Sequence, residues 1–306
     1  MAELIKYEAL LIWGKFVKPS PEEMRIIIDD INSFRPTILI GGQSCDVEFT
    51  VEDDSPHIQL NFSVDKAPFY EEGVLEEGAL MFLDGIVVDR LKDALFAINL
   101  AHPGRIHIFR STLCRDGDPV RDFAFSTDIS SAAYQECKWI PFEQLTIQQC
   151  WDWICTKTNF LGGISKSSID RALHALSYES VANEDMYIFY VMLGLEAIYN
   201  DGLNIEESIS AQMRRKVQSL LGEIPSSAIK DIKTMYSRRS SLVHGSANIY
   251  KCWGADDCTE DEAGKVEKER DYIITATGIL IATIQKFIKA NANVIKEKVT
   301  ISLGTE

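Results

Sequence analysis

The spacing of hydrophobic positions changes about halfway along the chain, which predicts two regions of different fold class. In the first half, residues 46–51 and 57–64 alternate apolar and polar positions, as half-buried strands do. After Gly162-Gly163 the apolar positions recur at helical spacing over long segments. We therefore expect an α+β domain over residues 1–160 followed by an all-α domain over residues 161–306.

The first half contains signals for individual elements. The two alternating segments predict a hairpin, and a helix is expected from Pro21 to Phe34, because Ser20 can cap it and proline is favoured at the first helical position. Gly41-Gly42 lacks the spacing of a phosphate-binding loop and predicts a turn. Further strands are predicted at 7–16, 37–39, 105–113 and 121–126, and further helices at 88–100 and 146–158.

The second half predicts five helices joined by short links, which is typical of an up-and-down bundle. Asn204 with Glu207 resembles a capping box at the start of the third helix, and Gly245 is placed to end the fourth. The five helices are predicted at 165–180, 184–199, 205–221, 227–243 and 264–290.

Charge is distributed unevenly along a chain whose net charge is −15. Thirteen acidic and three basic residues lie between Asp46 and Asp93, whereas eight basic and four acidic residues lie between Asn204 and Lys251. The overall charge argues against non-specific nucleic-acid binding by the whole chain. The locally basic stretch is nevertheless a candidate RNA-binding surface, and the alternative is an ordinary solvated helix face. Its candidate RNA-binding residues are Arg214, Arg215, Lys216, Lys230 and Lys233.

The composition does not favour export, membrane insertion or a cofactor. The longest apolar stretches, 79–88 and 273–284, are shorter than the ~20 residues of a membrane helix, and the N-terminus lacks the features of a signal peptide. Seven irregularly spaced cysteines without a Cys-x2-Cys pair favour reduced thiols over a disulfide framework or a zinc site. The alternative zinc site would combine Cys150 and Cys155 with Cys252 and Cys258. We expect a cytoplasmic protein that needs no metal and no cofactor.

The candidate chemistry lies near Gly245, at the end of the fourth predicted helix. RNA supplies its own 2′-hydroxyl nucleophile, so a cation for the transition-state charge and a group that moves a proton suffice without a metal. Arg239 can hold a phosphate through two hydrogen bonds, and His244 titrates near neutral pH. The helix C-terminus leaves His244 accessible and favours its protonated form. The small, polar Ser240 leaves room for a ligand.

Helical geometry limits what this pair can do within one chain. Five residues along an ideal helix place Arg239 and His244 ~140° apart. A dimer with two such segments face to face would gather both into one cleft. Glu196 lies in an apolar turn, and we expect it to pair with Arg238 or Arg239, because an unpaired buried carboxylate is costly. The alternative is that Glu196 faces solvent.

The string Tyr236-x-x-Arg239-Ser240-x-x-Val243-His244-Gly245 resembles the signature of Apea-like HEPN domains, a branch of the HEPN superfamily, and the turn Leu195-Glu196-Ala197 is similar to that branch. The resemblance covers residues 165–290, under half of the chain. It implies a helical bundle that dimerises with its R-x4-H segments opposed. It also implies a metal-independent ribonuclease, of the kind found in bacterial toxin and antiviral systems, that leaves a 2′,3′-cyclic phosphate.

The resemblance further implies roles for individual residues. Arg239 and His244 would be the catalytic pair, Glu196 would orient the arginine, and Tyr236 and Ser240 would support the site. Arg238 is an alternative catalytic arginine, since an R-x5-H spacing also falls within the superfamily.

One position departs from the pattern of HEPN toxins that are controlled by nucleotidyltransferase antitoxins. Such toxins typically carry a tyrosine two residues after the histidine, and Ser246 stands at that position here. A partner of that kind is therefore not expected.

Three hypotheses follow from the sequence. The first is an endoribonuclease that acts as a homodimer, and the intact Arg/His pair favours it. The second is a catalytically silent HEPN module that binds RNA or a partner protein, with the N-terminal half as a sensor or as an adaptor for a regulatory partner; the acidic net charge favours it. The third is an unrelated helical domain with a chance motif. The charge asymmetry also suggests that the acidic N-terminal half masks the basic cleft until a trigger displaces it.

Overall fold

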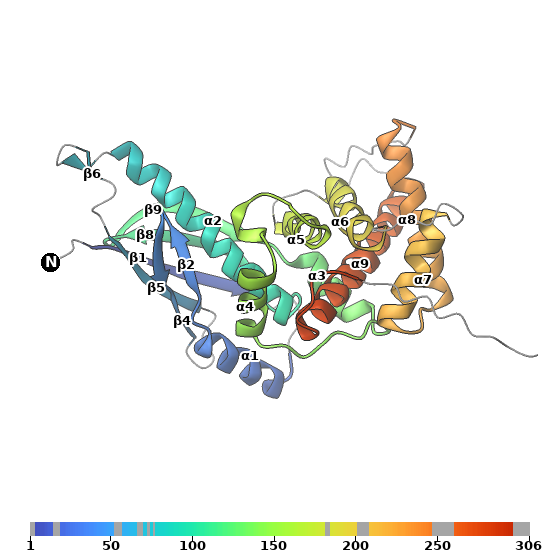
Figure 1. Cartoon of the computed structure of the whole chain (residues 1–306), viewed down its shortest axis with the longest axis horizontal. Helices are drawn as coiled ribbons and strands as arrows, with labels where there is room; N and C mark the ends of the chain where they lie inside the picture. The colour runs from blue at the N-terminus through green and yellow to red at the C-terminus, as the bar shows by residue number, and fades with distance from the viewer. Residues whose placement is uncertain are drawn as a thin grey trace, which may run out of the picture.

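A computed structural model of the chain describes residues 4–14, 19–51, 57–65, 70–71, 74–75, 77–180, 184–200, 208–246 and 260–295. A sheet-rich N-terminal region occupies one end of the molecule, and a group of helices occupies the other (Figure 1). The prediction of a region with a sheet followed by a helical region is confirmed.

A five-stranded antiparallel sheet, in the order β4-β5-β1-β8-β9, organises the N-terminal region. The predicted hairpin is present as β4 and β5, with Glu48 opposite Asn61, although its connecting turn lies outside the described residues. The strands are β1 (Leu4–Gly14), β4 (Glu48–Val51), β5 (His57–Asp65), β8 (His107–Arg115) and β9 (Asp118–Phe125).

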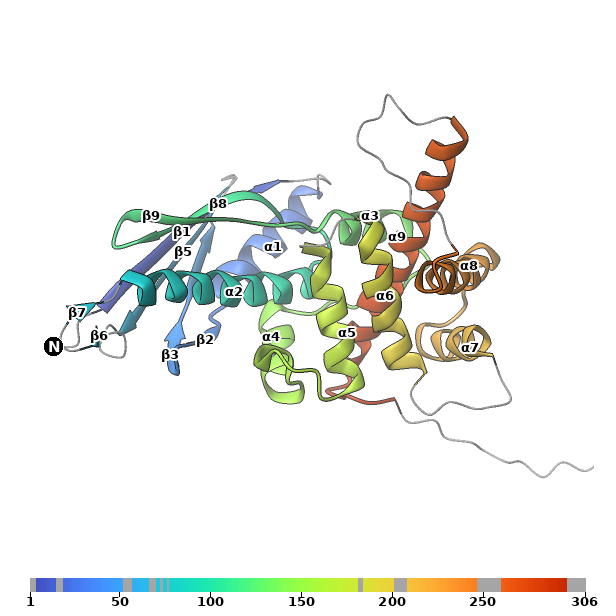
Figure 2. The ribbon, with the colours of Figure 1, turned by 90° about the horizontal axis from the view of Figure 1, so that it is seen from above.

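The sheet buries one face, because side chains alternate along each strand. In β5, Ile58, Leu60, Phe62 and Val64 are buried, and the residues between them are half-buried or exposed. The long helix α2 (Glu77–Ala101) runs beside the strands and contacts β9 (Figure 2).

Helix α1 (Pro21–Ser33) begins where the sequence predicts. The Ser20 hydroxyl accepts a hydrogen bond from the backbone of Glu23, whose carboxylate accepts one from the backbone of Ser20, so the two residues form a capping box. The helix contacts β4.

Several elements of this region differ from the prediction. Helix α2 starts eleven residues before the predicted Val88, and Met81 and Phe82 in its first half are exposed, so this half shows no clear amphipathic pattern. Helix α3 (Asp128–Glu136) was not predicted, because the residues it buries are mostly serine and alanine. The remaining strands form two short hairpins, β2 (Thr37–Ile40) with β3 (Gln43–Asp46), and β6 (Tyr70–Glu71) with β7 (Val74–Leu75).

The helical region agrees more closely with the prediction. Helix α6 has the predicted bounds, and α8 differs at one end by one residue. Helix α7 begins later than predicted and is capped by Ser208, while the expected capping residues Asn204 and Glu207 lie outside the described residues. The helices are α4 (Ile147–Lys157), α5 (Ser168–Ser177), α6 (Glu184–Tyr199), α7 (Ile209–Leu221), α8 (Ser226–Val243) and α9 (Glu260–Lys289), with short 3₁₀ turns at Phe160–Gly162 and Tyr178–Ser180.

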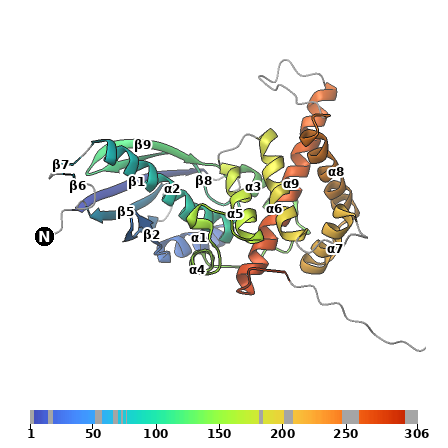
Figure 3. The ribbon, with the colours of Figure 1, turned by 45° about the horizontal axis from the view of Figure 1, so that its top comes forward.

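Helix α9 is the centre of the helical region. It contacts α5, α6, α7 and α8, and also α2, α3 and α4 from before the predicted boundary at residue 160 (Figure 3). One hydrophobic cluster runs through both regions. The boundary at residues 160/161 stays a prediction, and many packing contacts cross it.

The segment Glu267–Lys289 of α9 is long and apolar enough to cross a membrane by length and composition alone. In the fold, 83% of its apolar window is buried against other elements. A core helix of a folded protein passes the same test, so this segment is weak evidence for a membrane span.

Candidate functional site

Helix α8 ends in a closed turn that fixes the predicted motif. Gly245 has φ +67°, a left-handed conformation that glycine adopts without strain. Gly245 ends the helix as predicted, its hydrogen bonds form a Schellman motif, and the last turn does not unwind. The N–H groups of His244, Gly245 and Ser246 donate to the carbonyls of Ser240, Leu242 and Ser241 at 3.0, 3.1 and 2.9 Å.

Carboxylates from two other helices hold the two arginines of α8. Arg239 Nη2 lies 3.5 Å from Glu196 Oε2 of α6, and Arg238 Nη2 lies 2.8 Å from Glu269 Oε1 of α9. All four side chains are between 18% and 26% exposed, so the pairs are largely shielded from water. Of the two partners predicted for Glu196, the structure selects Arg239, and the alternative that Glu196 faces solvent is wrong.

Burial dominates the environment of Glu196. It raises the pKa of the carboxyl, and the positive charge of Arg239 lowers it by a smaller amount. Glu196 Oε1 and Arg239 Nε are buried and make no hydrogen bond with the described residues. An unsatisfied buried polar atom costs about 1–3 kcal/mol.

His244 stands apart from the arginines. It is exposed at the C-cap, and because the helix is regular up to Val243, the ~140° separation from Arg239 applies. The separation from Arg238 is ~120° by the same geometry. Within one chain the structure therefore brings together the arginines and their carboxylates, and it leaves the histidine on another side of the helix.

The supporting residues lie on the same helix as the motif. Tyr236 is half-buried against the hydrophobic core, and Ser240 is half-buried one turn before His244. Arg239 follows Tyr236 by three residues, so the two side chains share a side of α8.

The predicted RNA-binding residues separate into two groups. Arg214, Arg215, Lys230 and Lys233 are exposed, in α7 and α8. Lys216 is only 6% exposed, because it shares the inward face of α7 with Met213 and Val217. Its predicted contact with RNA is wrong for this fold.

Sequence reasoning missed Glu269. It lies in a run of charged residues, Glu267-Lys268-Glu269-Arg270, which has the composition of a solvated helix face. Only the packing of α9 against α8 reveals that this one carboxylate meets an arginine.

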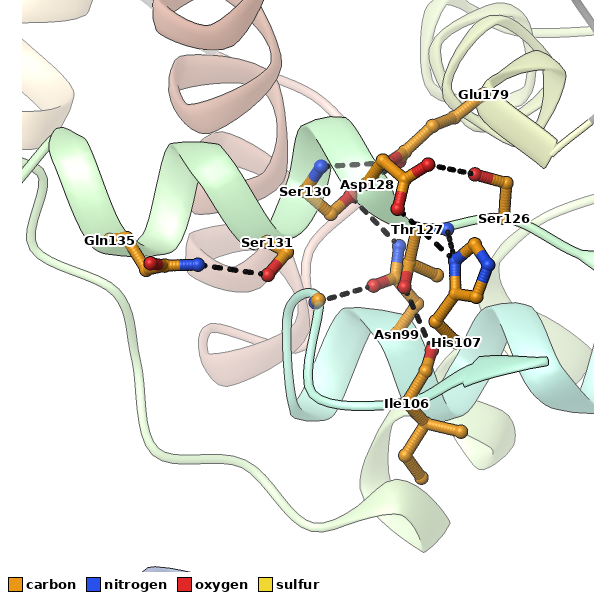
Figure 4. A network of polar contacts seen from close by, with 11 residues as sticks. Asn99, Ile106, His107, Ser126, Thr127, Asp128, Ser130, Ser131, Gln135 and Glu179 are labelled. Carbon is orange, nitrogen blue, oxygen red and sulfur yellow. Dashed lines mark hydrogen bonds and ion pairs between the residues drawn. The ribbon is translucent and has the colours of Figure 1, made fainter. Parts of the chain in front are cut away.

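A buried polar cluster joins the two regions (Figure 4). Glu179, just after α5, accepts a hydrogen bond of 2.7 Å from the backbone N–H of Ser130 at the start of α3, and another from the Ser130 hydroxyl. Thr127, the N-cap residue of α3, makes no side-chain cap of its own. Glu179 thus caps α3 from a distant part of the chain. Burial raises the pKa of Glu179 to about 7.

His107 belongs to the same cluster. The backbone N–H of Thr127 donates to His107 Nδ1 at 3.2 Å, and Asp128 Oδ1 lies 3.3 Å from that nitrogen (Figure 4). Burial lowers the pKa of His107, which favours the neutral ring that accepts the Thr127 hydrogen bond. We interpret the cluster as a structural link, because His107, Ser130 and Glu179 are buried between elements, and only Asp128 is half-exposed.

Metal ligands were not predicted, and the described residues contain no group of three or more histidine, cysteine or acidic side chains that could hold a metal. Cys150 is fully buried in α4, and Cys155 is exposed, so this predicted alternative for a zinc site has no geometric support. Cys252 and Cys258 lie outside the described residues.

Comparisons with protein-family models, with curated proteins and with solved structures found no match to this chain. The resemblance to HEPN domains therefore rests on the quoted residues and stays a prediction.

Proposed function

We propose that this protein is a metal-independent endoribonuclease of the Apea-like HEPN type that acts as a homodimer. The observation that carries the proposal is the end of α8. Two adjacent arginines are held there by carboxylates from α6 and α9, and an exposed histidine follows at a rigid helix cap. The packing of α5 to α9 around a central helix supports a HEPN-type bundle.

The proposed reaction is an attack of the RNA 2′-hydroxyl on the adjacent phosphorus. His244 takes the 2′-hydroxyl proton or donates a proton to the departing 5′-oxygen, and Arg239 stabilises the charge on the phosphoryl oxygens. The products are a 2′,3′-cyclic phosphate and a free 5′-hydroxyl. Glu196 would hold the guanidinium in place from α6. A role in antiviral defence or as a toxin fits such an activity.

The dimer follows from geometry. Arg239 and His244 point to different sides of α8, so one active site is best formed by the arginine of one copy and the histidine of another. Figures 1 and 2 show α7 and α8 at the end of the molecule farthest from the sheet, where a second copy can approach α8.

The direct test is cleavage of labelled tRNA and single-stranded RNA in the presence of EDTA. We expect cleavage by the wild type and its loss in Arg239→Ala and in His244→Ala. Arg110→Ala is the matched control, because Arg110 is 75% exposed on the sheet and distant in the fold from α8. Retention of full cleavage in either site variant would refute the proposed roles.

Mixing the two inactive variants tests the shared site. If each site combines the arginine of one copy with the histidine of the other, exchanged heterodimers regain one working site, so about a quarter of the wild-type activity should return. An arrangement within one chain predicts no recovery. A strictly monomeric wild type in light scattering would contradict the dimer itself.

A catalytically silent module that binds RNA or a partner protein is the second candidate. The net charge of −15 and the burial of Lys216, which shrinks the basic surface, favour it. RNA binding that depends on Lys230 and Lys233, without cleavage of any tested RNA, would support this candidate over the first.

A further inference from the structure

A cavity of about 590 Å³ lies where the sheet region meets the helical region. It is bounded by α1, the end of α2, α3 and residues 142–149. Its volume is within the ~300–1,000 Å³ range of small-molecule sites. Its apolar lining includes Ile26, Ile27, Phe142 and Leu145. The proposed ribonuclease site, at the far end of the helical region, does not use it (Figure 1).

A rigid turn presents two polar side chains to this cavity. Arg105 N–H donates to the carbonyl of His102 at 3.1 Å, and Gly104 has φ +66°. With Pro103 before the glycine, these features define a type II turn. The Gly104 N–H donates to Asn99 Oδ1 at 2.8 Å, which fixes the turn to α2. The sequence His-Pro-Gly-Arg thus places His102 and Arg105 at the two ends of one fixed turn.

Arg105 is a buried cation with unused donors. Its side chain is 8% exposed, Nη2 donates to Glu23 Oε1 at 3.0 Å, and the guanidinium lies 4.4 Å from the ring centroid of Tyr134. Its Nε and Nη1 donate no hydrogen bond to any described residue, and neither of these two atoms is completely shielded from solvent. Nη1 therefore keeps N–H groups free to donate to an oxygen of an anion such as a phosphate.

His102 is held in a similar way through one nitrogen. Nε2 lies 2.7 Å from Asp30 Oδ2, which also accepts the backbone N–H of Ile147 at 3.0 Å. Nδ1 has no partner within the described part of the chain. A carboxylate that orients one imidazole nitrogen leaves the other to contact a ligand.

Each of the four carboxylates that line the cavity has a partner, and the weakest pairing is that of Asp29, 3.9 Å from the guanidinium of Arg25. Asp30 is paired with His102, and Glu23 with Arg105 and the backbone of Ser20. Glu143 is paired with two lysines of α9, Lys286 and Lys289. The groups that remain free to bind a ligand are therefore the nitrogens of Arg105 and His102, which favours an anion.

We propose that the cavity binds a small organic phosphate monoester. Nη1 of Arg105 donates to one phosphate oxygen, and Nδ1 of His102, at the other end of the turn, exchanges a hydrogen bond with another. The organic part of the ligand packs on the apolar lining. The proposal does not depend on ribonuclease activity.

Calorimetric titration of the full-length protein tests the site, with AMP, inorganic phosphate and adenosine as probes. AMP should bind more tightly than either of the others, because it carries both the anion and an organic body. Arg105→Gln should weaken AMP binding at least ~10-fold, because it removes a positive charge and a charge-assisted hydrogen bond to the phosphate. Arg110→Gln, on the exposed sheet, should bind like the wild type.

A second variant guards against misfolding of Arg105→Gln. Gln144 is exposed at the cavity wall, so Gln144→Glu should weaken AMP binding severalfold by charge repulsion without a change in melting temperature. The surface variant Gln59→Glu is its control. Arg239→Ala and His244→Ala should bind AMP normally, which separates this cavity from the proposed RNA site.

Three outcomes would overturn the proposal. They are no AMP binding at millimolar concentration, adenosine binding as tight as AMP binding, and AMP binding that survives both Arg105→Gln and Gln144→Glu.

Discussion

Glu179 and Ser130 come from opposite sides of the predicted domain boundary, and their contact lies out of reach of water. A carboxyl group in such a place prefers to be protonated, and its pKa of about 7 reflects this. In the unfolded chain its pKa is near the ordinary 4.5. The contact that joins the two regions is therefore sensitive to pH.

The sign of this effect gives the first prediction. Between pH 4.5 and about 7 the folded state binds more protons at Glu179 than the unfolded state does, so the contribution of Glu179 to stability is greatest below pH 4.5 and is lost as pH rises through about 7. The full loss is about 3 kcal/mol. Asp93, whose pKa burial raises to about 6, adds a change of the same sign.

Chemical denaturation of Glu179→Gln between pH 4 and pH 8 measures the effect. The variant should show a clearly flatter loss of stability over this range than the wild type. Glu136 is exposed at the end of α3, the helix that Glu179 caps, so Glu136→Gln should keep the wild-type dependence of stability on pH. Equal slopes for all three proteins would contradict the buried, protonated state of Glu179.

Gly104 gives a second prediction at this scale. A Cβ atom there would lie 2.0 Å from Ser131 Cα, in addition to the strain of a positive φ. Gly104→Ala should cost on the order of 3 kcal/mol or more in unfolding free energy. Gly117→Ala has a similar positive φ but open space around it, and should cost about 1 kcal/mol. Similar costs for the two variants would refute the close approach of the turn to α3.

At the scale of single elements, helix ends are well determined by local sequence. The start of α1 and the end of α8 follow from Ser20 and Gly245, because capping needs only neighbouring residues. Helix α3 depends instead on Glu179, about 50 residues away, and on the close packing of small side chains. No local pattern carries that information, so the sequence alone could not predict it.

Some residues of the candidate site could likewise be predicted from local sequence, and others depend on packing between helices. Arg239 and His244 follow from a short motif, and the carboxylate of Glu196 could be expected from its apolar turn. Glu269 and the inward orientation of Lys216 depend on how α9 and α7 pack, which sequence spacing does not specify.

The cap of α8 can be tested as an element. Gly245→Ala should destabilise the protein by about 1 kcal/mol, because alanine disfavours the left-handed conformation. Gly245→Asn should cost less, since asparagine tolerates that conformation. Thermal unfolding measures the loss of stability in both variants. If Gly245→Asn destabilises the protein as much as Gly245→Ala does, the loss does not come from the φ angle.

At the scale of the whole molecule, the arrangement argues against one form of regulation. The described parts of the stretch from Asp46 to Asp93 lie in the sheet-rich N-terminal region, whereas α8 lies at the opposite end of the molecule (Figures 1 and 2). Masking of the basic surface by the acidic N-terminal half of the same chain is therefore not supported. Contact with another copy remains compatible with the fold.

The shared core predicts cooperative unfolding. Calorimetry of the full chain should show a single transition, since α3 and α4 pack on α9 across the predicted boundary. A fragment of residues 161–306 should lack cooperative unfolding, because deletion of the first half exposes that face of α9. Two separate transitions, or a fragment that melts cooperatively, would instead establish two independent domains.

The central position of α9 has a consequence for how the protein is made. Gln285 of α9 donates to the carbonyl of Leu100 at 2.8 Å and accepts a hydrogen bond from the backbone N–H of Glu143. Backbone groups of two earlier segments thus find their hydrogen-bond partner in the last helix. During synthesis, the apolar surfaces around Leu100 stay uncovered until the ribosome has released α9. Such a nascent chain exposes hydrophobic surface for many seconds at ordinary translation rates. Early termination before α9 should therefore yield an aggregation-prone product, and chaperones that hold nascent chains should raise the yield of native protein.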